Sequence, residues 1–146
     1  MRITQEADYA IRICCLLSTS EGITDAASIS DSVAVPPRFA LKILRKLSQG
    51  GAVRSHKGAT GGYELALDPQ TLTVRQVVEL IDGPIYISKC LSSGHACTNN
   101  PEKSCCRMHN LFSQLNDMLT ERLDRVTVAS VADSSIPLSE LLEIIK

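Results

Sequence analysis

Thiol and imidazole side chains gather in one stretch of the sequence, KCLSSGHACTNNPEKSCCRMH at residues 89–109. It holds four of the six cysteines and two of the three histidines in a chain of 146 residues. Zinc and iron–sulfur sites use these donors. Their spacing is Cys90-x6-Cys97-x7-Cys105-Cys106-x2-His109. It has neither the Cys-x2-Cys pair of common structural zinc sites nor a ferredoxin run. Widely spaced donors in a loop rich in Gly, Ser, Asn and Pro therefore predict a soft metal centre held against a rigid element.

The residues alone leave the choice of ligands open. Cys106 and His109 are three positions apart, so at the start of a helix they lie on one face. Cys105 and Cys106 are adjacent and cannot both easily point to the same centre, so one of them is expected to be a spare thiol. His95 lies between two cysteines, and we interpret it as a loop residue. An iron–sulfur cluster with three thiolates and one oxygen or nitrogen ligand therefore competes with a zinc site and with a redox-active Cys105–Cys106 pair.

Composition and charge limit the partners and the cellular compartment that we expect for this chain. The net charge is −1, so attraction to a polyanion has to come from local clustering of charge. The first residues show no apolar run of roughly 7–15 residues behind a basic start. No segment approaches the roughly 18 apolar residues of a membrane span. We therefore expect a cytoplasmic chain, in which thiols stay reduced and a disulfide knot is disfavoured.

The first half of the chain predicts short helices. Apolar residues at helical spacing predict a helix over about 4–19, in which Cys14 and Cys15 are interpreted as small core residues. Thr24 is a candidate N-cap for a second, short helix. These two helices would form the core against which the next helix packs.

A third helix is predicted over about 37–49, between Pro37 and the Gly50-Gly51 pair. Arg38, Lys42 and Arg45 lie at i, i+4 and i+7, so they share its solvent face. Two short helices joined by a tight turn, the second basic on its outer face, form a helix-turn-helix hypothesis.

A glycine-tipped hairpin is predicted to follow, with strands near 52–56 and 63–67. Between residues 32 and 63 there is no Asp or Glu, while six of the chain's 15 lysines and arginines lie there. A basic helix followed by a basic hairpin is typical of a winged helix-turn-helix, in which the helix would enter the major groove of DNA and the wing would lie along the backbone or minor groove. The predicted DNA-binding residues are Arg38, Lys42, Arg45, Arg54, His56 and Lys57.

The second half of the chain predicts a helical arm. Thr73 to Gln76 read as a capping box that opens a further helix, which stops at Asp82-Gly83-Pro84. After Arg107 an apolar stripe continues for about twenty residues. This long helix either folds back on its own domain or pairs with a second copy of the chain, and we favour a homodimer. One or two short helices are expected at the C-terminal end.

In the order and spacing of these pieces, the chain resembles the bacterial winged-helix regulators of the Rrf superfamily, in the cluster-binding branch typified by IscR, NsrR and RirA. The resemblance runs from Met1 to about Asp133. It rests on MRIT, FALKILRKL, the wing from Gly58 to Tyr63, TVRQVVELIDG, and three loop cysteines before a long helix. It implies a homodimer with swapped long helices, a palindromic double-stranded DNA operator, and in many members a [2Fe-2S] or [4Fe-4S] cluster that controls DNA binding.

The resemblance also implies cluster ligands. Cys90 and Cys97 match the first two cluster cysteines. In IscR-like members the third cysteine is followed by x2-His, which selects Cys106, with Cys105 as the alternative third ligand.

Two candidates for the fourth ligand follow from the same resemblance. IscR-like members point to His109. NsrR-like members use an aspartate of the first helix that reaches across from the partner subunit, and Asp8 stands at that position. The longer loop and the Pro36-Pro37 pair depart from the family pattern, and they leave the cluster type and the operator class open.

The expected fold is mainly α with a small β-hairpin, a winged helix-turn-helix plus a long C-terminal dimerisation helix. The expected division is residues 1–83 for DNA binding, 84–106 for a cysteine-rich cluster-binding loop, and 107–146 for dimerisation. The expected function is iron–sulfur-dependent control of transcription by a homodimer that senses the state of its cluster (iron, nitric oxide or redox). The sequence leaves open whether it is a repressor or an activator, and the alternative is a cluster-free thiol switch or partner-docking regulator. No nucleophile–base pair, phosphate loop or paired carboxylates emerge, so an enzyme is not predicted.

Overall fold

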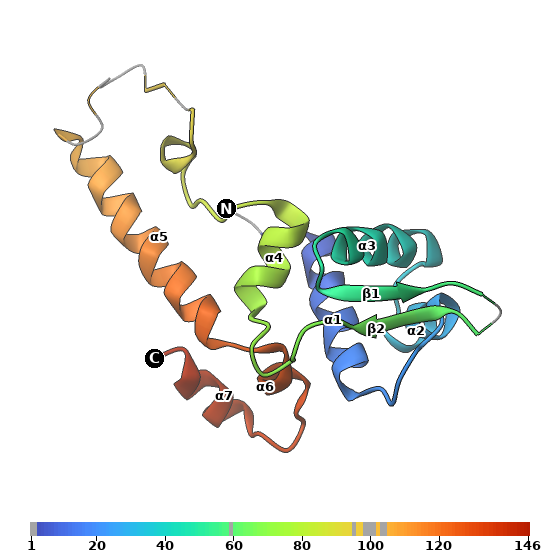
Figure 1. Cartoon of the computed structure of the whole chain (residues 1–146). Helices are drawn as coiled ribbons and strands as arrows, with labels where there is room; N and C mark the ends of the chain where they lie inside the picture. Colours follow the sequence, from blue (N-terminus) through green and yellow to red (C-terminus); the bar gives the residue numbers. More distant parts are fainter. Residues whose placement is uncertain (1–2, 59, 95, 98–101, 103–104) are drawn as a thin grey trace.

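A computed structural model describes residues 3–58, 60–94, 96–97, 102 and 105–146 of the chain. It is mainly α-helical with one two-stranded antiparallel hairpin, which confirms the predicted fold class (Figure 1). His95 lies outside the described residues, so its predicted role as a loop residue stays a prediction. The elements in chain order are α1 (Gln5–Thr19), α2 (Ala26–Ser32), α3 (Pro37–Gln49), β1 (Val53–His56), β2 (Gly62–Leu65), α4 (Val74–Asp82), the short 3-10 helix η1 (Lys89–Leu91), α5 (Arg107–Arg125), α6 (Val128–Ala132) and α7 (Leu138–Ile144).

Helix α1 is the centre of the fold. Thr4 caps it by accepting a hydrogen bond from the backbone N–H of Ala7, and the Thr4 hydroxyl donates to Asp82 at the end of α4, with 2.6 Å between the oxygens. The buried face of α1 packs against α3, α4 and α6. Cys14 on this face is fully buried, as predicted for a small core residue. The aliphatic core thus fixes α1 between the two halves of the chain.

The predicted cap of α2 was wrong. Asp25, not Thr24, is the N-cap, and its Oδ1 accepts hydrogen bonds from the N–H groups of Ala27 and Ser28. A carboxylate satisfies the unpaired donors at a helix start well. Thr24 instead pairs with Tyr63 in an isolated β-bridge, which attaches the start of α2 to the hairpin.

The helix-turn-helix and the hairpin follow the predicted pattern. Pro37 begins α3, whose buried stripe is Ala40, Ile43, Leu44 and Leu47. Leu67 was expected in the second strand, but β2 ends at Leu65 and Leu67 is exposed. Gly62 is required by contact, because a Cβ at this position would lie 2.5 Å from the carbonyl oxygen of Thr24.

The second half of the chain returns to the same core. The predicted capping box of α4 is present, with Thr73 and Gln76 each bonding the other's backbone. Helix α5 runs along α4, away from α3 and the hairpin (Figure 1). After α5 the chain turns back, and the fully buried side chain of Val128 in α6 joins the core around α1. Over the described ranges, every helix is too short or too polar to cross a membrane.

Candidate functional site

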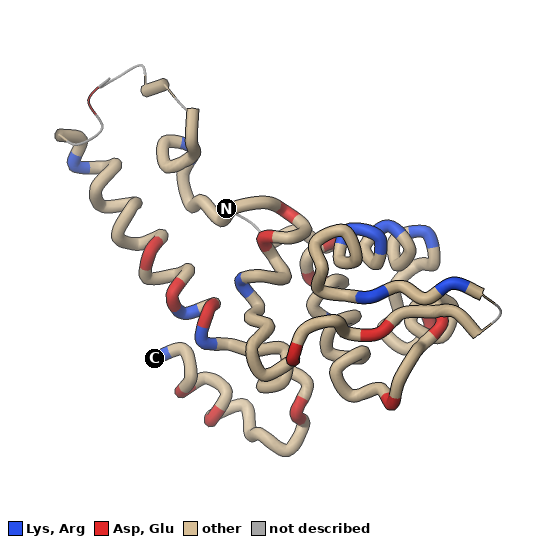
Figure 2. The backbone as a smooth tube through the Cα atoms, in the orientation of Figure 1, with Lys and Arg blue, Asp and Glu red and all other residues tan. Residues whose placement is uncertain are grey.

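The outer face of α3 combines positive charge with exposed apolar groups. Arg38, Lys42 and Arg45 are all exposed on it, as predicted. Figure 2 shows the lysines and arginines of α3 in blue. Phe39 and Leu41 are also about half exposed, at 52% and 50%. Sequence periodicity gave these two apolar residues no role, because they fall outside the buried stripe. A helix face with guanidinium groups beside apolar side chains can contact both phosphates and base edges, including thymine methyl groups.

A shallow hollow separates α3 from the hairpin. Its lining residues come from both elements and are Leu41, Arg45, Ser48, Gln49, Ser55 and Tyr63. Leu41 and Arg45 belong both to this lining and to the exposed face of α3, so the hollow and the basic face form one continuous surface.

Lysines of α3 are paired with a carboxylate of α1. Glu6 forms ion pairs with Lys42 at 3.1 Å and with Lys46 at 3.2 Å. Lys46 also donates a hydrogen bond to the carbonyl oxygen of Ile81 in α4. Burial raises the pKa of Glu6, but the hydrogen bonds from Lys42 and Lys46 outweigh it and leave the pKa below its ordinary value. The orientation of α3 is therefore coupled to both α1 and α4.

The hairpin, which we call the wing together with its turn, also carries predicted residues. Arg54 and Lys57 are exposed, and His56 is half-buried. Glu64 on β2 forms ion-pair contacts with both Arg54 and His56. Within the described part of the chain, Arg38, Arg45 and Lys57 make no ion pair. Among the predicted DNA-binding residues, these three cations are the most available to an anionic partner.

The predicted thiol ligands lie along the segment between α4 and α5. Cys90 is in η1, where its Sγ lies 3.3 Å from the hydroxyl of Ser88. Cys97 and Cys106 are partly exposed, and Cys105 is exposed. No group of three or more Cys, His, Asp or Glu side chains converges among the described residues. The predicted ligands thus share one loop, but they are not gathered at one point in the single chain.

Cys106 and His109 open α5, as predicted. Cys106 is the N-cap residue, and its side chain makes no capping hydrogen bond. The Nδ1 atom of His109 is buried and has no hydrogen-bond partner among the described residues. A buried ring nitrogen without a partner is unusual, because buried polar atoms are normally satisfied. Three partly exposed thiols and this nitrogen form a donor set that fits a soft metal group such as an iron–sulfur cluster.

Asp8, the other candidate fourth ligand, lies on α1 and not on the loop. Its carboxylate is 2.7 Å from the guanidinium of Arg12 one turn later. Arg12 also lies over the ring of Tyr9, at 5.7 Å from the ring centroid. The side chain of Asp8 is about half exposed, at 48%. It can therefore face a second molecule if it exchanges its contact with Arg12.

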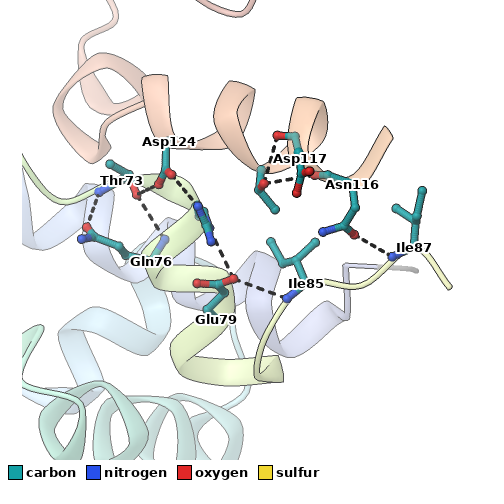
Figure 3. Close-up of polar contacts among 10 residues, drawn as sticks. Thr73, Gln76, Glu79, Ile85, Ile87, Asn116, Asp117 and Asp124 are labelled. Atoms are coloured by element: carbon teal, nitrogen blue, oxygen red, sulfur yellow. Dashed lines mark hydrogen bonds and ion pairs between the residues drawn. The ribbon is translucent and has the colours of Figure 1, made fainter. Parts of the chain in front are cut away.

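A polar network not predicted from the sequence attaches the cysteine loop to α5. Asn116 is nearly buried, and its Oδ1 accepts a hydrogen bond of 2.9 Å from the backbone N–H of Ile87, three residues before Cys90 (Figure 3). Further along α5, Asp124 pairs with Arg75 of α4 at 2.6 Å. The start of the loop, α4 and α5 are therefore held together as one unit.

The cysteines of α1 are separate from this loop. Burial raises the pKa of the Cys14 thiol to about 12. It also raises the pKa of Cys15, whose Sγ lies 3.9 Å from the carbonyl oxygen of Val128. Reactive cysteines need thiolate character, and the burial of these two thiols in α1 disfavours the thiolate form.

Comparison with known proteins finds a matching family, similar sequences and a similar solved structure. Residues 3–134 match the family model Rrf2, described as an iron-dependent transcriptional regulator. A helix-turn-helix regulator of Rhodobacter capsulatus named rrf2-like is 28% identical over 148 residues, covering 97% of this chain and 99% of the relative. IscR of Escherichia coli is 26% identical over 136 residues, covering 92% and 82%. The structure of CymR, the global cysteine regulator of B. subtilis, shares the fold with a TM-score of 0.73 and 24% identity, covering 94% and 99%.

Proposed function

Because this chain belongs to the Rrf2 family of DNA-binding transcriptional regulators, we propose that it reads a double-stranded operator with α3 and the wing. Arg38 and Arg45 make no ion pair among the described residues, and they are exposed beside Phe39 and Leu41 on the same helix face. In helix-turn-helix proteins the second helix enters the major groove, while adjacent basic segments contact the backbone. Lys57, at the turn of the wing, is the residue we assign to phosphate contact.

We propose that a second copy of the chain covers the free face of α5. Leu111, Leu115 and Met118 are 49%, 44% and 56% exposed along this helix, whereas Leu119 and Leu123 pack against the core. An exposed apolar stripe on a helix usually marks an interaction surface. A two-fold dimer would place two copies of α3 on the half-sites of a palindromic operator.

We propose an iron–sulfur cluster as the cofactor of the cysteine loop, as [2Fe-2S] or [4Fe-4S]. Cys90, Cys97 and Cys106 would hold it, with His109 or the Asp8 of a second copy as the fourth ligand. The observation that supports this most directly is the buried His109 Nδ1, which has no partner within the described structure and lies one turn after Cys106. When bound, such a group supplies a redox- and ligand-sensitive centre.

The side chains of this protein offer a route from the loop to α3. Asn116 ties the start of the loop to α5, and Asp124 with Arg75 ties α5 to α4. The end of α4 then accepts the hydrogen bond from Lys46 of α3. We infer that binding of the cluster by the loop changes the orientation of the two recognition helices in a dimer, and so their fit to two half-sites. Such coupling between two sites typically amounts to about 1–3 kcal/mol.

Spectra of anaerobically prepared protein test the cofactor. Visible absorbance, Mössbauer spectra and iron and sulfide content are measured for the unaltered chain and for two matched pairs, Cys105→Ala with Cys106→Ala and Asp8→Ala with His109→Ala. We expect iron and sulfide in the unaltered protein, and loss of both in one member of each pair. The absence of iron and sulfide would contradict the cluster, and one tightly held zinc without colour would indicate a zinc site instead.

A second candidate is a thiol switch in the same fold. Cys105 is exposed and immediately precedes Cys106, the N-cap residue of α5. Exposed thiols are the ones that oxidants reach. If metal-free protein bound DNA with full affinity and lost it on mild oxidation, and if Cys105→Ala removed that loss, the thiol switch would replace the cluster.

A further inference from the structure

A count of charges along the sequence overestimates the positive charge of the wing. The acid-free window ends at Tyr63, and the next residue is Glu64. In the hairpin, Glu64 lies directly opposite Arg54. In Figure 2 a red segment lies on the strand β2, beside the blue segments of β1. The strand pairing thus brings a carboxylate into a surface that the sequence alone presents as purely cationic.

The contacts of Glu64 are made by a single oxygen. Its Oε1 lies 3.0 Å from a terminal nitrogen of Arg54 and 2.9 Å from Nε2 of His56. Residues 54 and 56 lie on the same face of β1, because side chains in a strand alternate. Direct cross-strand partners have Cβ atoms about 4.5–5.5 Å apart, so the hairpin itself keeps this acid beside Arg54.

We propose that Glu64 limits the sequence-independent affinity of the wing for DNA, and so acts as a specificity-determining residue. Its carboxylate forms an ion pair with the guanidinium of Arg54, so this guanidinium is not available to bind a phosphate. The same carboxylate repels phosphates that approach His56. Non-specific binding is supplied almost entirely by phosphate neutralisation. Base contacts from α3 therefore contribute a larger share of the total affinity. The inference rests on the proposed role of the wing in DNA binding.

A purely structural role for Glu64 predicts the opposite sign. If the carboxylate only stabilised the hairpin, its removal would loosen the wing and weaken DNA binding. If it holds Arg54 away from phosphate, its removal strengthens binding and adds one phosphate contact. Each added contact steepens the dependence of log K on log salt by about 0.9, which is roughly a threefold larger loss of affinity between about 50 and 200 mM salt.

The substitution Glu64→Gln tests this, because the amide keeps the length of the side chain and an acceptor for Arg54. Affinity for a random-sequence duplex is measured by fluorescence anisotropy over a range of salt concentrations. The control is Glu140→Gln, which removes one charge from the exposed start of α7. We expect tighter binding and the steeper salt dependence for Glu64→Gln alone. Equal slopes for Glu64→Gln, Glu140→Gln and the unaltered protein would overturn the inference, and so would weaker binding.

Arg54→Ala separates this inference from the proposed function. Because Arg54→Ala leaves the negative charge of Glu64 without this partner, we expect it to weaken DNA binding, and we expect the double variant Arg54→Ala/Glu64→Gln to lose the extra salt dependence. If Arg54→Ala weakens binding while Glu64→Gln has no effect, only the inference is wrong. If Arg54→Ala, His56→Ala and Lys57→Ala all leave the affinity unchanged, the wing does not contact DNA and the proposed DNA-binding surface is wrong with it.

Discussion

Replacing Asn116 by alanine is expected to loosen the start of the cysteine loop. Asn116 is 9% exposed, and its side chain accepts the hydrogen bond from Ile87 N–H at 2.9 Å. The substitution removes that acceptor from the middle of α5. Because Ile87 is only half-buried, water can partly replace the lost partner. The loop segment that leads to Cys90 would then open more often than in the unaltered protein.

The size of this effect follows from two opposing contributions. A lost hydrogen bond costs about 0.5–1.5 kcal/mol, and more where the N–H stays dry. Alanine in a helix interior recovers about 0.5 kcal/mol relative to asparagine. The free energy of unfolding should therefore fall by only about 1 kcal/mol or less. The free energy of local opening at Ile87 falls by the full value of the lost hydrogen bond. This corresponds to roughly a tenfold faster amide exchange.

Hydrogen exchange at the Ile87 amide measures this directly. The matched control is Asn116→Asp, which keeps an acceptor oxygen at the same place. We expect faster exchange in Asn116→Ala and near-normal protection in Asn116→Asp. The interpretation of Asn116 as the anchor of the loop would be refuted if Ile87 exchanged at the same rate in all three proteins.

Three further predictions follow from other contacts. Gly62→Ala should destabilise the fold by about 1–3 kcal/mol through overpacking, because the added Cβ would meet the Thr24 carbonyl at 2.5 Å; an unchanged Tm would contradict this. The ion pairs of Glu6 leave its pKa below the ordinary 4.5. The contribution of the ionised Glu6 side chain to the free energy of unfolding is therefore present above that pH and is lost as the pH falls below it. Acid denaturation of Glu6→Gln should therefore show a smaller loss of unfolding free energy over the same range, and identical pH profiles would argue against it. Leu115→Asp should shift sedimentation from dimer to monomer, whereas Asp117→Asn, an exposed position on another side of α5, should not; a dimer in both would refute pairing through the apolar face of α5.

Local signals predicted the elements well. The capping box from Thr73 to Gln76 and the start of α3 at Pro37 depend on neighbouring residues, so a short window of sequence contains the physics that forms them. The one wrong cap shows the limit of such signals. Thr24 has the right residue type, but a long-range bridge to Tyr63 uses its backbone, and Asp25 caps α2 instead.

The charges of the candidate site could not be predicted in the same way. Glu6 reaches Lys42 across 36 positions of the sequence, and Glu64 reaches Arg54 only because of the register of the hairpin. Both pairs depend on tertiary arrangement. The same is true of Asn116, because its sequence neighbours Leu115 and Asp117 give no sign of its bond to Ile87. The sequence thus predicts which cations lie on the surface, and the fold decides which of them are available.

DNA affinity compared between cluster-loaded and metal-free protein tests the central proposal, that the cysteine loop controls binding by α3 and the wing. A duplex is first selected from a random pool by the anaerobic protein, and its Kd is then measured for both forms at one salt concentration. We predict Kd values that differ by about tenfold or more, which corresponds to at least about 1.4 kcal/mol of coupling. Equal Kd values for the two forms would contradict control by the loop.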